Sequence, residues 1–160
     1  MGDLLDLARA ERAAPGAALA EDAADLVCAA RAMSERFRHG GRLLAFGSPA
    51  DAAHVAVEFT HPVIVGKRAL PALSVDAALL RTLGRAGDLA VGIGPPIDGR
   101  ALETAAALGM LTVVLTMPGA VAAADHVLVA RTSDPMIARE LHVTAYHLLW
   151  ELVHIFLETS

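Results

Sequence analysis

From residue 42 onward, short apolar segments typical of buried strands alternate with segments typical of helices. The strand-like segments are residues 42–46, 71–74, 88–93, 111–115 and 127–129. The helical segments are residues 49–60, 76–83, 99–108 and 135–157. Strands that alternate with helices in this way form a parallel sheet with helices on both faces. We therefore predict an α/β fold, with ligand sites at the turns that follow the strands.

Residues 1–39 precede this alternation and are helical in character. We predict one helix over residues 2–12, a break at Pro15 and Gly16, and a second helix that ends near Arg38. At 160 residues the chain has the length of one domain. We divide it into an N-terminal helical segment, residues 1–39, and an α/β core, residues 40–160. The first two helices carry more apolar surface than one small sheet can cover, which predicts a homo-oligomer, a dimer or a tetramer.

Charge and cysteine content narrow the classes of function. The net charge is −5 and the basic residues are scattered, which argues against nucleic acid and against a basic helix on a membrane surface. The single cysteine, Cys28, lies among apolar residues of a predicted helix, so we expect a buried core thiol. One cysteine allows no intramolecular disulfide, which fits a cytoplasmic protein.

One stretch is long enough to span a membrane. Residues 104–124 contain no charged side chain. Gly109 and the Pro118-Gly119 pair divide this stretch into pieces of helix and strand length. We therefore predict a helix, a strand and a loop here, with no membrane span. Asp3 and Asp6, together with the lack of an apolar run near the start, predict no signal peptide.

The first candidate site follows the first strand. Residues 47–50 (GSPA) form a short turn, and the helix after it carries His54 and Glu58 four residues apart, on one face. Read without further context, this pair is either a hydrogen-bonded pair on a helix surface or part of a metal or acid/base site.

Several phrases resemble the sugar isomerase (SIS) domain, in the subgroup of phosphoheptose isomerase. They run in the family's order over nearly the whole chain. The matching segments are residues 53–60 (AHVAVEFT), 70–72 (LPA), 83–88 (LGRAGD), 108–113 (LGMLTV), 124–128 (ADHVL), 140–142 (ELH) and 147–153 (HLLWELV). The resemblance implies a three-layer α/β/α fold with a flavodoxin-like parallel sheet. It also implies an aldose–ketose isomerase of sugar phosphates, commonly a homotetramer and in some members zinc-bound.

The resemblance also assigns residues. It implies that Glu58 and His147 are the catalytic proton-transfer pair, and that His54, Glu58 and His147 are zinc ligands in metal-bound members. Asp76 matches a substrate-site aspartate of the family. A glutamine that completes the metal group in the family is Arg139 in this chain, and a guanidinium cannot coordinate a metal.

The departures from the family lie at the phosphate-binding turns. The first turn is shortened to residues 47–50 and keeps one hydroxyl, Ser48. The second turn, residues 94–99 (GPPIDG), has no hydroxyl; its two prolines lack N–H donors, and Asp98 would repel a phosphate. A loop and helix that the family has between Asp76 and residue 83 are missing. We therefore expect the phosphate clamp and part of the pocket wall to be lost.

The remaining polar residues have competing interpretations. Glu140, His147 and His154 are seven residues apart, so Glu140 is a further candidate ligand in place of the missing glutamine; the alternative is a polar stripe that faces solvent or a subunit interface. For Ser48 we favour a helix-capping role over phosphate or substrate binding. His61, His126 and His142 are expected to be surface or structural residues.

Two functions follow. The first is a divergent sugar isomerase-like protein that keeps the site of His54, Glu58 and His147, with zinc as its cofactor and a sugar or polyol derivative as its ligand. The second is a non-catalytic oligomeric scaffold or metal-binding accessory protein that acts through contacts with a protein partner. The loss of both phosphate turns favours the second function, and the three retained polar residues favour a site of some kind.

Overall fold

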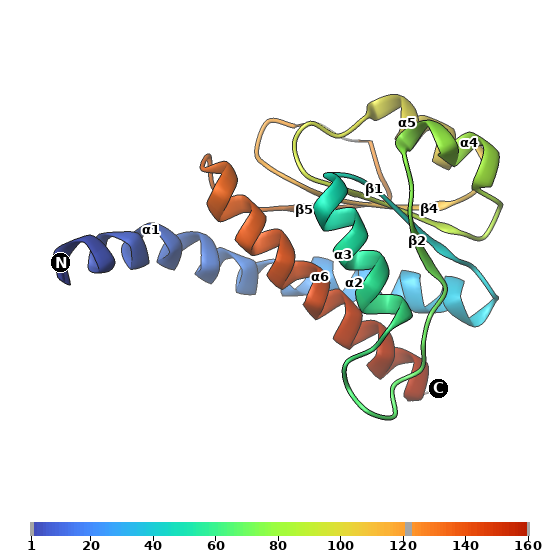
Figure 1. Cartoon of the computed structure of the whole chain (residues 1–160), viewed down its shortest axis with the longest axis horizontal. Coiled ribbons are helices and arrows are strands. Elements are labelled where there is room, and N and C mark those ends of the chain that lie inside the picture. The colour runs from blue at the N-terminus through green and yellow to red at the C-terminus, as the bar shows by residue number, and fades with distance from the viewer. Residues whose placement is uncertain (1, 121–122, 160) are drawn as a thin grey trace.

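The computed structural model describes residues 2–120 and 123–159. Its centre is a five-stranded sheet in which every neighbouring pair of strands is parallel (Figure 1). The strands are β1 (Leu43–Gly47), β2 (Ala72–Ser74), β3 (Leu89–Ile93), β4 (Leu111–Thr116) and β5 (His126–Val129), in the order β2-β1-β3-β4-β5. This is the flavodoxin-like order, so the α/β prediction is confirmed.

The helices cover both faces of this sheet. They are α1 (Gly2–Glu21), α2 (Ala23–Arg38), α3 (Pro49–Thr60), the short η1 (Ala77–Leu79) and α4 (Leu80–Leu83), α5 (Gly99–Ala107) and α6 (Pro135–Glu158). Alternate strand residues face two apolar clusters, as the pleat of a strand requires. Leu43 and Ala45 join the cluster under α2, α3 and α6, whereas Leu44 and Phe46 join the cluster under α4 and α5.

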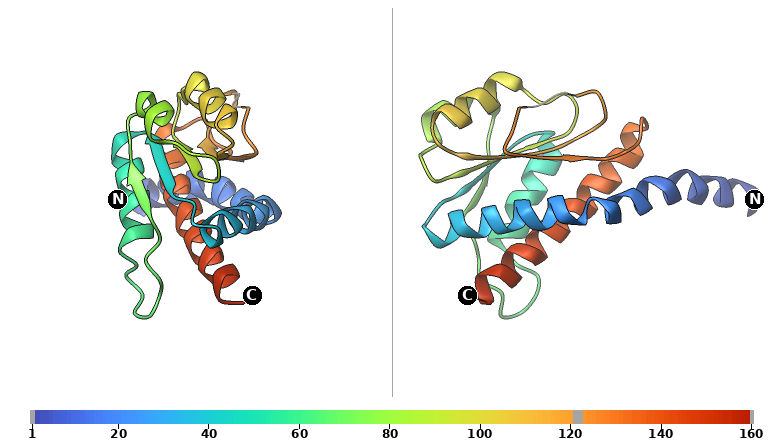
Figure 2. Two further views of the ribbon diagram at one scale, coloured as in Figure 1. Left: turned by 90° about the vertical axis from the view of Figure 1, so that its right-hand side faces the viewer. Right: turned by 180° about the vertical axis from the view of Figure 1, so that it is seen from behind.

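The N-terminal segment differs from the prediction. The break that we expected at Pro15 and Gly16 is absent: Pro15 lies inside α1, and the boundary with α2 is at Asp22. A proline removes one helical hydrogen bond, and the alanines on both sides of it are the best helix formers. The two helices form a nearly continuous rod whose first half extends away from the rest of the molecule (Figure 2).

Cys28 is exposed, so the prediction of a buried thiol was wrong. The core face of α2 is formed by Leu26, Ala29, Ala30, Met33 and Phe37, which recur at the helical period. Cys28 lies outside that stripe and is turned away from the core.

Within the described residues, no helix is long and apolar enough to cross a membrane. Residues 104–124, the uncharged stretch that is long enough to span a membrane, include the end of α5, a turn at Gly109 and strand β4. Its end includes residues 121–122, which lie outside the described part of the chain.

Candidate metal and acid/base site

Helices α3 and α6 lie side by side on one face of the sheet, and three predicted site residues meet between them (Figure 1). His54 and Glu58 are one turn apart on α3, and His147 comes from the middle of α6. The three can each offer a ligand atom such that all these atoms lie within 4.8 Å of one another. The structure therefore brings together residues that are almost ninety positions apart in the sequence.

The carboxylate of Glu58 is the centre of this group. Its Oε1 atom lies 3.2 Å from His54 Nε2 and 3.8 Å from His147 Nε2. The Glu58 side chain is mostly buried, at 16% exposure, while both histidines are 42% exposed. The imidazole rings meet edge to face at a centroid distance of 5.3 Å. The two histidines therefore face solvent, and the Glu58 carboxylate lies beneath them, nearer the interior of the protein.

The donor set fits a divalent metal such as zinc. Two imidazoles and one carboxylate are zinc ligands, and three protein ligands leave a fourth position open, as in catalytic sites. Tetrahedral bonds of about 2.1 Å place ligand atoms about 3.4 Å apart. The 3.2 Å and 3.8 Å separations in the structure bracket that value. Small side-chain movements are therefore enough to close the three ligands around an ion.

Tyr146 also contacts this group, and the sequence analysis did not identify it. Its hydroxyl lies 2.7 Å from Nδ1 of His54, and its ring meets the rings of both His54 and His147 edge to face. Burial raises the pKa of this hydroxyl to about 12, so Tyr146 keeps its proton at neutral pH. Its place directly before His147, as the only tyrosine of the chain, was the one available signal.

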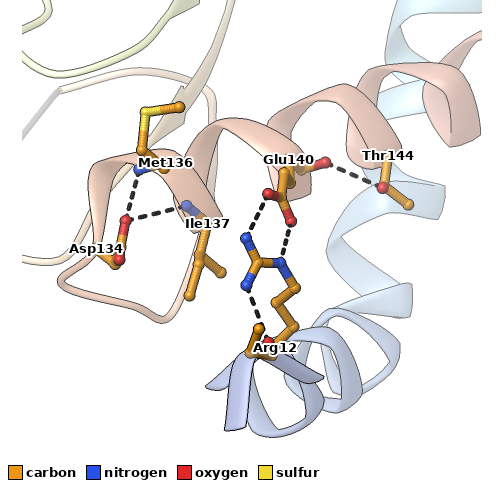
Figure 3. A network of polar contacts seen from close by, with 7 residues as sticks. Arg12, Asp134, Met136, Ile137, Glu140 and Thr144 are labelled. Atoms are coloured by element: carbon orange, nitrogen blue, oxygen red, sulfur yellow. Dashed lines mark hydrogen bonds and ion pairs between the residues drawn. The ribbon is translucent and has the colours of Figure 1, made fainter. Parts of the chain in front are cut away.

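Glu140 is not part of this cluster. Its carboxylate accepts two hydrogen bonds of 2.8 Å from the Arg12 guanidinium of α1 (Figure 3). The pair holds α1 against the start of α6, beside the Asp134 cap of that helix. Hydrogen bonding to Arg12 lowers the pKa of the Glu140 carboxyl. The Glu140 carboxylate is therefore bound by Arg12 and is not among the described residues that could hold a metal ion together.

The predicted polar stripe along α6 is interrupted in the same way. His154 is buried at 2% exposure, and its ring nitrogens lie near the carbonyl oxygens of Trp150 and Arg68. His154 therefore fits neither interpretation of the stripe, as a metal ligand or as a side chain facing solvent or a subunit interface. His142 is also buried, and its Nε2 donates to the carbonyl of Thr116. Both histidines connect α6 to neighbouring parts of the chain and take no part in the cluster.

Arg139 stands where the family resemblance predicts a glutamine, and its side chain points to α3. Its Nε donates to Oδ1 of the buried Asp51 at 3.1 Å, and Ser48 donates its hydroxyl to Oδ2 of the same carboxylate at 2.6 Å. Ser48 makes no side-chain cap, so the predicted capping role was wrong. These three residues line a cavity of about 300 Å³ between the turns after β1 and β3.

Two backbone donors at the two turns already have partners. The Ser48 amide donates to the carbonyl of Ile93, and the Gly94 amide donates to that of Leu115. Pro95 and Pro96 have no N–H. Asp98 accepts hydrogen bonds from the Arg100 and Ala101 amides at the start of α5. A carboxylate thus occupies the helix N-terminus where an anion would bind.

Asp76 lies apart from the three-residue cluster. It caps η1 by accepting from the Ala78 amide, and it lines a second hollow of about 460 Å³ at the carboxyl ends of β1 and β2. Asp98 lines the same hollow. The hollow is therefore acidic at two points, which disfavours an anionic ligand.

Curated relatives identify the family. The chain is 38% identical to a phosphoheptose isomerase of Desulfovibrio desulfuricans over 74% of this chain and 70% of that protein. It is 31% identical to a phosphoheptose isomerase of Roseiflexus over 80% of each chain. The chain belongs to the phosphoheptose isomerase family of SIS-domain proteins. No protein-family profile matches it.

Solved structures of this family share the fold of the chain. The phosphoheptose isomerase GmhA of Neisseria gonorrhoeae superposes with a TM-score of 0.82 at 22% identity, over 95% of this chain and 97% of that one. A phosphoheptose isomerase of Francisella tularensis superposes with a TM-score of 0.79 at 19% identity, over 94% and 98% of the two chains. These similarities confirm the SIS-domain architecture predicted from the sequence.

Proposed function

We propose that this chain is a divergent member of the phosphoheptose isomerase family that holds a divalent metal ion, most simply zinc, at His54, Glu58 and His147. We further propose that it no longer acts on a sugar phosphate bound in the family's way. Its ligand is then a sugar or polyol derivative that needs no phosphate clamp. The single cysteine fits the reducing environment of the cytoplasm as its place of action.

The observation that carries this proposal is the state of the phosphate-binding turns. The Ser48 hydroxyl is committed to Asp51, and the Ser48 and Gly94 amides are committed to strand carbonyls. A phosphate dianion that used these donors would have to displace internal hydrogen bonds, and it would lie near the Asp98 carboxylate. Displacing satisfied donors and adding a like charge both oppose binding.

The three-residue cluster, in contrast, keeps the means for chemistry. A bound metal ion would supply a Lewis acid that polarises a ligand oxygen at the open position. Without a bound metal ion, Glu58 and His147 can instead accept and return a proton, because a carboxylate and an imidazole beside each other are suited to acid/base work. Their separation of 3.8 Å places both within reach of one ligand atom.

A second candidate function is favoured by α1. Leu4, Leu5 and Leu7 are exposed, at 73%, 55% and 57%, on the part of α1 that extends from the body. Exposed leucines on a projecting helix are typical of an assembly surface. In this alternative the chain is a non-catalytic oligomeric scaffold, or a metal-binding accessory protein, that acts through its subunit or partner contacts.

The deciding experiment is metal analysis of the purified protein. We expect about one zinc per chain after equilibration with zinc in the wild type, and loss of the metal in Glu58→Gln and in His147→Ala. His61→Ala is the matched control, because His61 is exposed at the end of α3 and lies outside the cluster. A wild type that takes up no metal would overturn the metal-site proposal.

A turnover assay on a ketoheptose phosphate tests the second part. We expect no conversion to the aldose above the rate of the Glu58→Gln variant. Conversion by the wild type that disappears in Glu58→Gln would show that a sugar phosphate is still the substrate, and the loss of the clamp would then have no functional consequence. Metal binding without turnover is expected of both candidate functions; conversion of a sugar or polyol without phosphate that is lost in Glu58→Gln would favour the first, and its absence would favour the accessory-protein alternative.

A further inference from the structure

Tyr146 connects the two histidines of the cluster. Its side chain is buried, at 1% exposure, under the half-exposed His54 and His147. Its ring lies 5.3 Å from the His54 ring and 5.1 Å from the His147 ring, in edge-to-face contacts with interplanar angles of 84° and 73°. A buried, two-torsion aromatic residue in contact with both rings fixes their positions more firmly than a flexible side chain could.

The hydrogen bonds of His54 determine where its proton lies. Nε2 faces the Glu58 carboxylate at 3.2 Å, and an ionised carboxylate can only accept. A neutral imidazole therefore carries its proton on Nε2 and has a lone pair on Nδ1. The Tyr146 hydroxyl, 2.7 Å from Nδ1, is then the donor to that lone pair.

A metal ion at Nε2 requires the opposite arrangement. The Nε2 lone pair must face the metal, so the proton of the neutral ring lies on Nδ1, which becomes a donor. A hydroxyl can accept this hydrogen bond as well as donate, whereas a carbonyl can only accept and a phenylalanine can do neither. Tyr146 is thus a partner for His54 in both states, and no other described residue contacts His54 Nδ1 within hydrogen-bond distance.

We infer that Tyr146 is a positioning residue for this centre: its hydroxyl donates to Nδ1 of the Nε2-protonated His54 without metal and accepts from Nδ1 when Nε2 binds a metal ion. The first half of this inference concerns the metal-free protein alone. The second half rests on the proposed metal site. When a metal ion binds, the His54 ring loses the proton on Nε2 and takes up one on Nδ1. The ring therefore stays neutral, and no further reactant is needed.

The test uses the Tyr146→Phe variant, which keeps the ring and removes the hydroxyl. Nitrogen-15 NMR of the histidine side chains gives the protonation of each ring nitrogen directly. We expect His54 to be protonated on Nε2 in both metal-free proteins, because Glu58 is unchanged, and we expect the Nδ1 resonance to move in Tyr146→Phe, because this nitrogen loses its hydrogen-bond donor. Addition of Zn²⁺ to the wild type should move the His54 proton to Nδ1. The zinc Kd of the variant should rise about 10-fold or more, as for other residues that orient a ligand.

The control is Thr144→Val, which removes a hydroxyl from the exposed side of α6. Among the described residues, this hydroxyl bonds only to the Glu140 carbonyl. It should match the wild type in both measurements. A His54 Nδ1 resonance in metal-free Tyr146→Phe that equals that of the wild type would overturn the inference, whatever the zinc affinity. If the wild type binds no zinc, the proposed metal site fails, and the Nδ1 resonance of the metal-free proteins still decides the role of Tyr146.

Discussion

Arg139 and Asp51 join helix α6 to the first turn of helix α3, with 3.1 Å between Nε and Oδ1. Asp51 is 4% exposed, and its second oxygen accepts from Ser48. This pair keeps Arg139 away from the metal cluster, and it withdraws the serine of the phosphate turn from any ligand. It also fixes α6 against α3, and therefore fixes the distance between His147 and Glu58.

Arg139→Ala should destabilise the protein, because it leaves the buried Asp51 carboxylate with Ser48 as its remaining partner among the side chains described. An incompletely paired buried charge costs about 1–3 kcal/mol, and the half-exposed arginine keeps the effect below that of a fully buried pair. Urea denaturation gives the change in the free energy of unfolding. Arg12→Ala removes the exposed pair with Glu140 and should have a much smaller effect. Equal losses in the two variants would contradict a structural role for the Arg139–Asp51 pair.

The parallel sheet could be predicted from sequence because strand and helix periodicities are local, whereas its flavodoxin-like order came from the family resemblance. Residues 89–93 are apolar throughout, and residues 111–115 are apolar except for Thr112, as is typical of strands buried on both faces. The N-terminal segment was harder, because a proline is a local signal whose effect depends on the whole helix. Pro15 has alanine-rich helix on both sides, and propensity over the longer window outweighs one lost hydrogen bond.

The site was partly predictable for a related reason. His54 and Glu58 form a local pair, and only the family resemblance predicted that His147 belongs to the same site. Tyr146, Arg139 and Asp51 act through contacts between two helices, and no spacing along either helix announces those contacts. Glu140 shows the opposite case. Its seven-residue spacing does place it on the same face of α6 as His147, but Arg12 of α1 binds its carboxylate. Side-chain partners from distant segments are therefore what sequence reasoning missed here.

The stability of the protein should depend on pH through His142. Burial lowers the pKa of this imidazole below its ordinary value of 6.5, and the hydrogen bond to Thr116 offsets only part of that effect. The folded state thus binds fewer protons than the unfolded state. The stability contribution is complete above pH 6.5 and is lost as the pH falls below that value.

His142→Gln keeps a donor for the Thr116 carbonyl and removes the titrating ring. We expect the free energy of unfolding of this variant to fall less than that of the wild type between pH 7 and about pH 5. Chemical denaturation at several pH values measures this difference. His61→Gln, on the exposed end of α3, should leave the wild-type pH dependence unchanged. Parallel curves for wild type and His142→Gln would show that burial of His142 does not contribute.

The oligomeric state should depend on the leucines of α1. Leu4 and Leu7 are exposed on the part of the helix that extends from the body, and we expect a second copy of the chain to cover them. The double variant Leu4→Glu, Leu7→Glu should lower the mass measured by sedimentation at a fixed concentration, because a charge at a buried interface opposes association. Ala10→Glu is the comparison variant, because it introduces a negative charge at another exposed position of α1. A mass that is the same for all three proteins would place the assembly surface elsewhere.

Gly47 should be the least replaceable residue of the turn before the site. It has φ +105°, and a Cβ built on it would lie 2.4 Å from the Ile93 carbonyl oxygen. That oxygen also accepts from the Ser48 amide, so the turn, the start of α3 and strand β3 are held together at one point. Gly47→Ala should lower the free energy of unfolding by about 2–5 kcal/mol, from backbone strain plus overpacking. Gly40→Ala separates the two causes, because Gly40 has φ +83° with open space around it, and only the strain of about 1–2 kcal/mol applies. If the two variants unfold at the same urea concentration, the close approach to Ile93 is not what requires glycine, and left-handed backbone alone explains it.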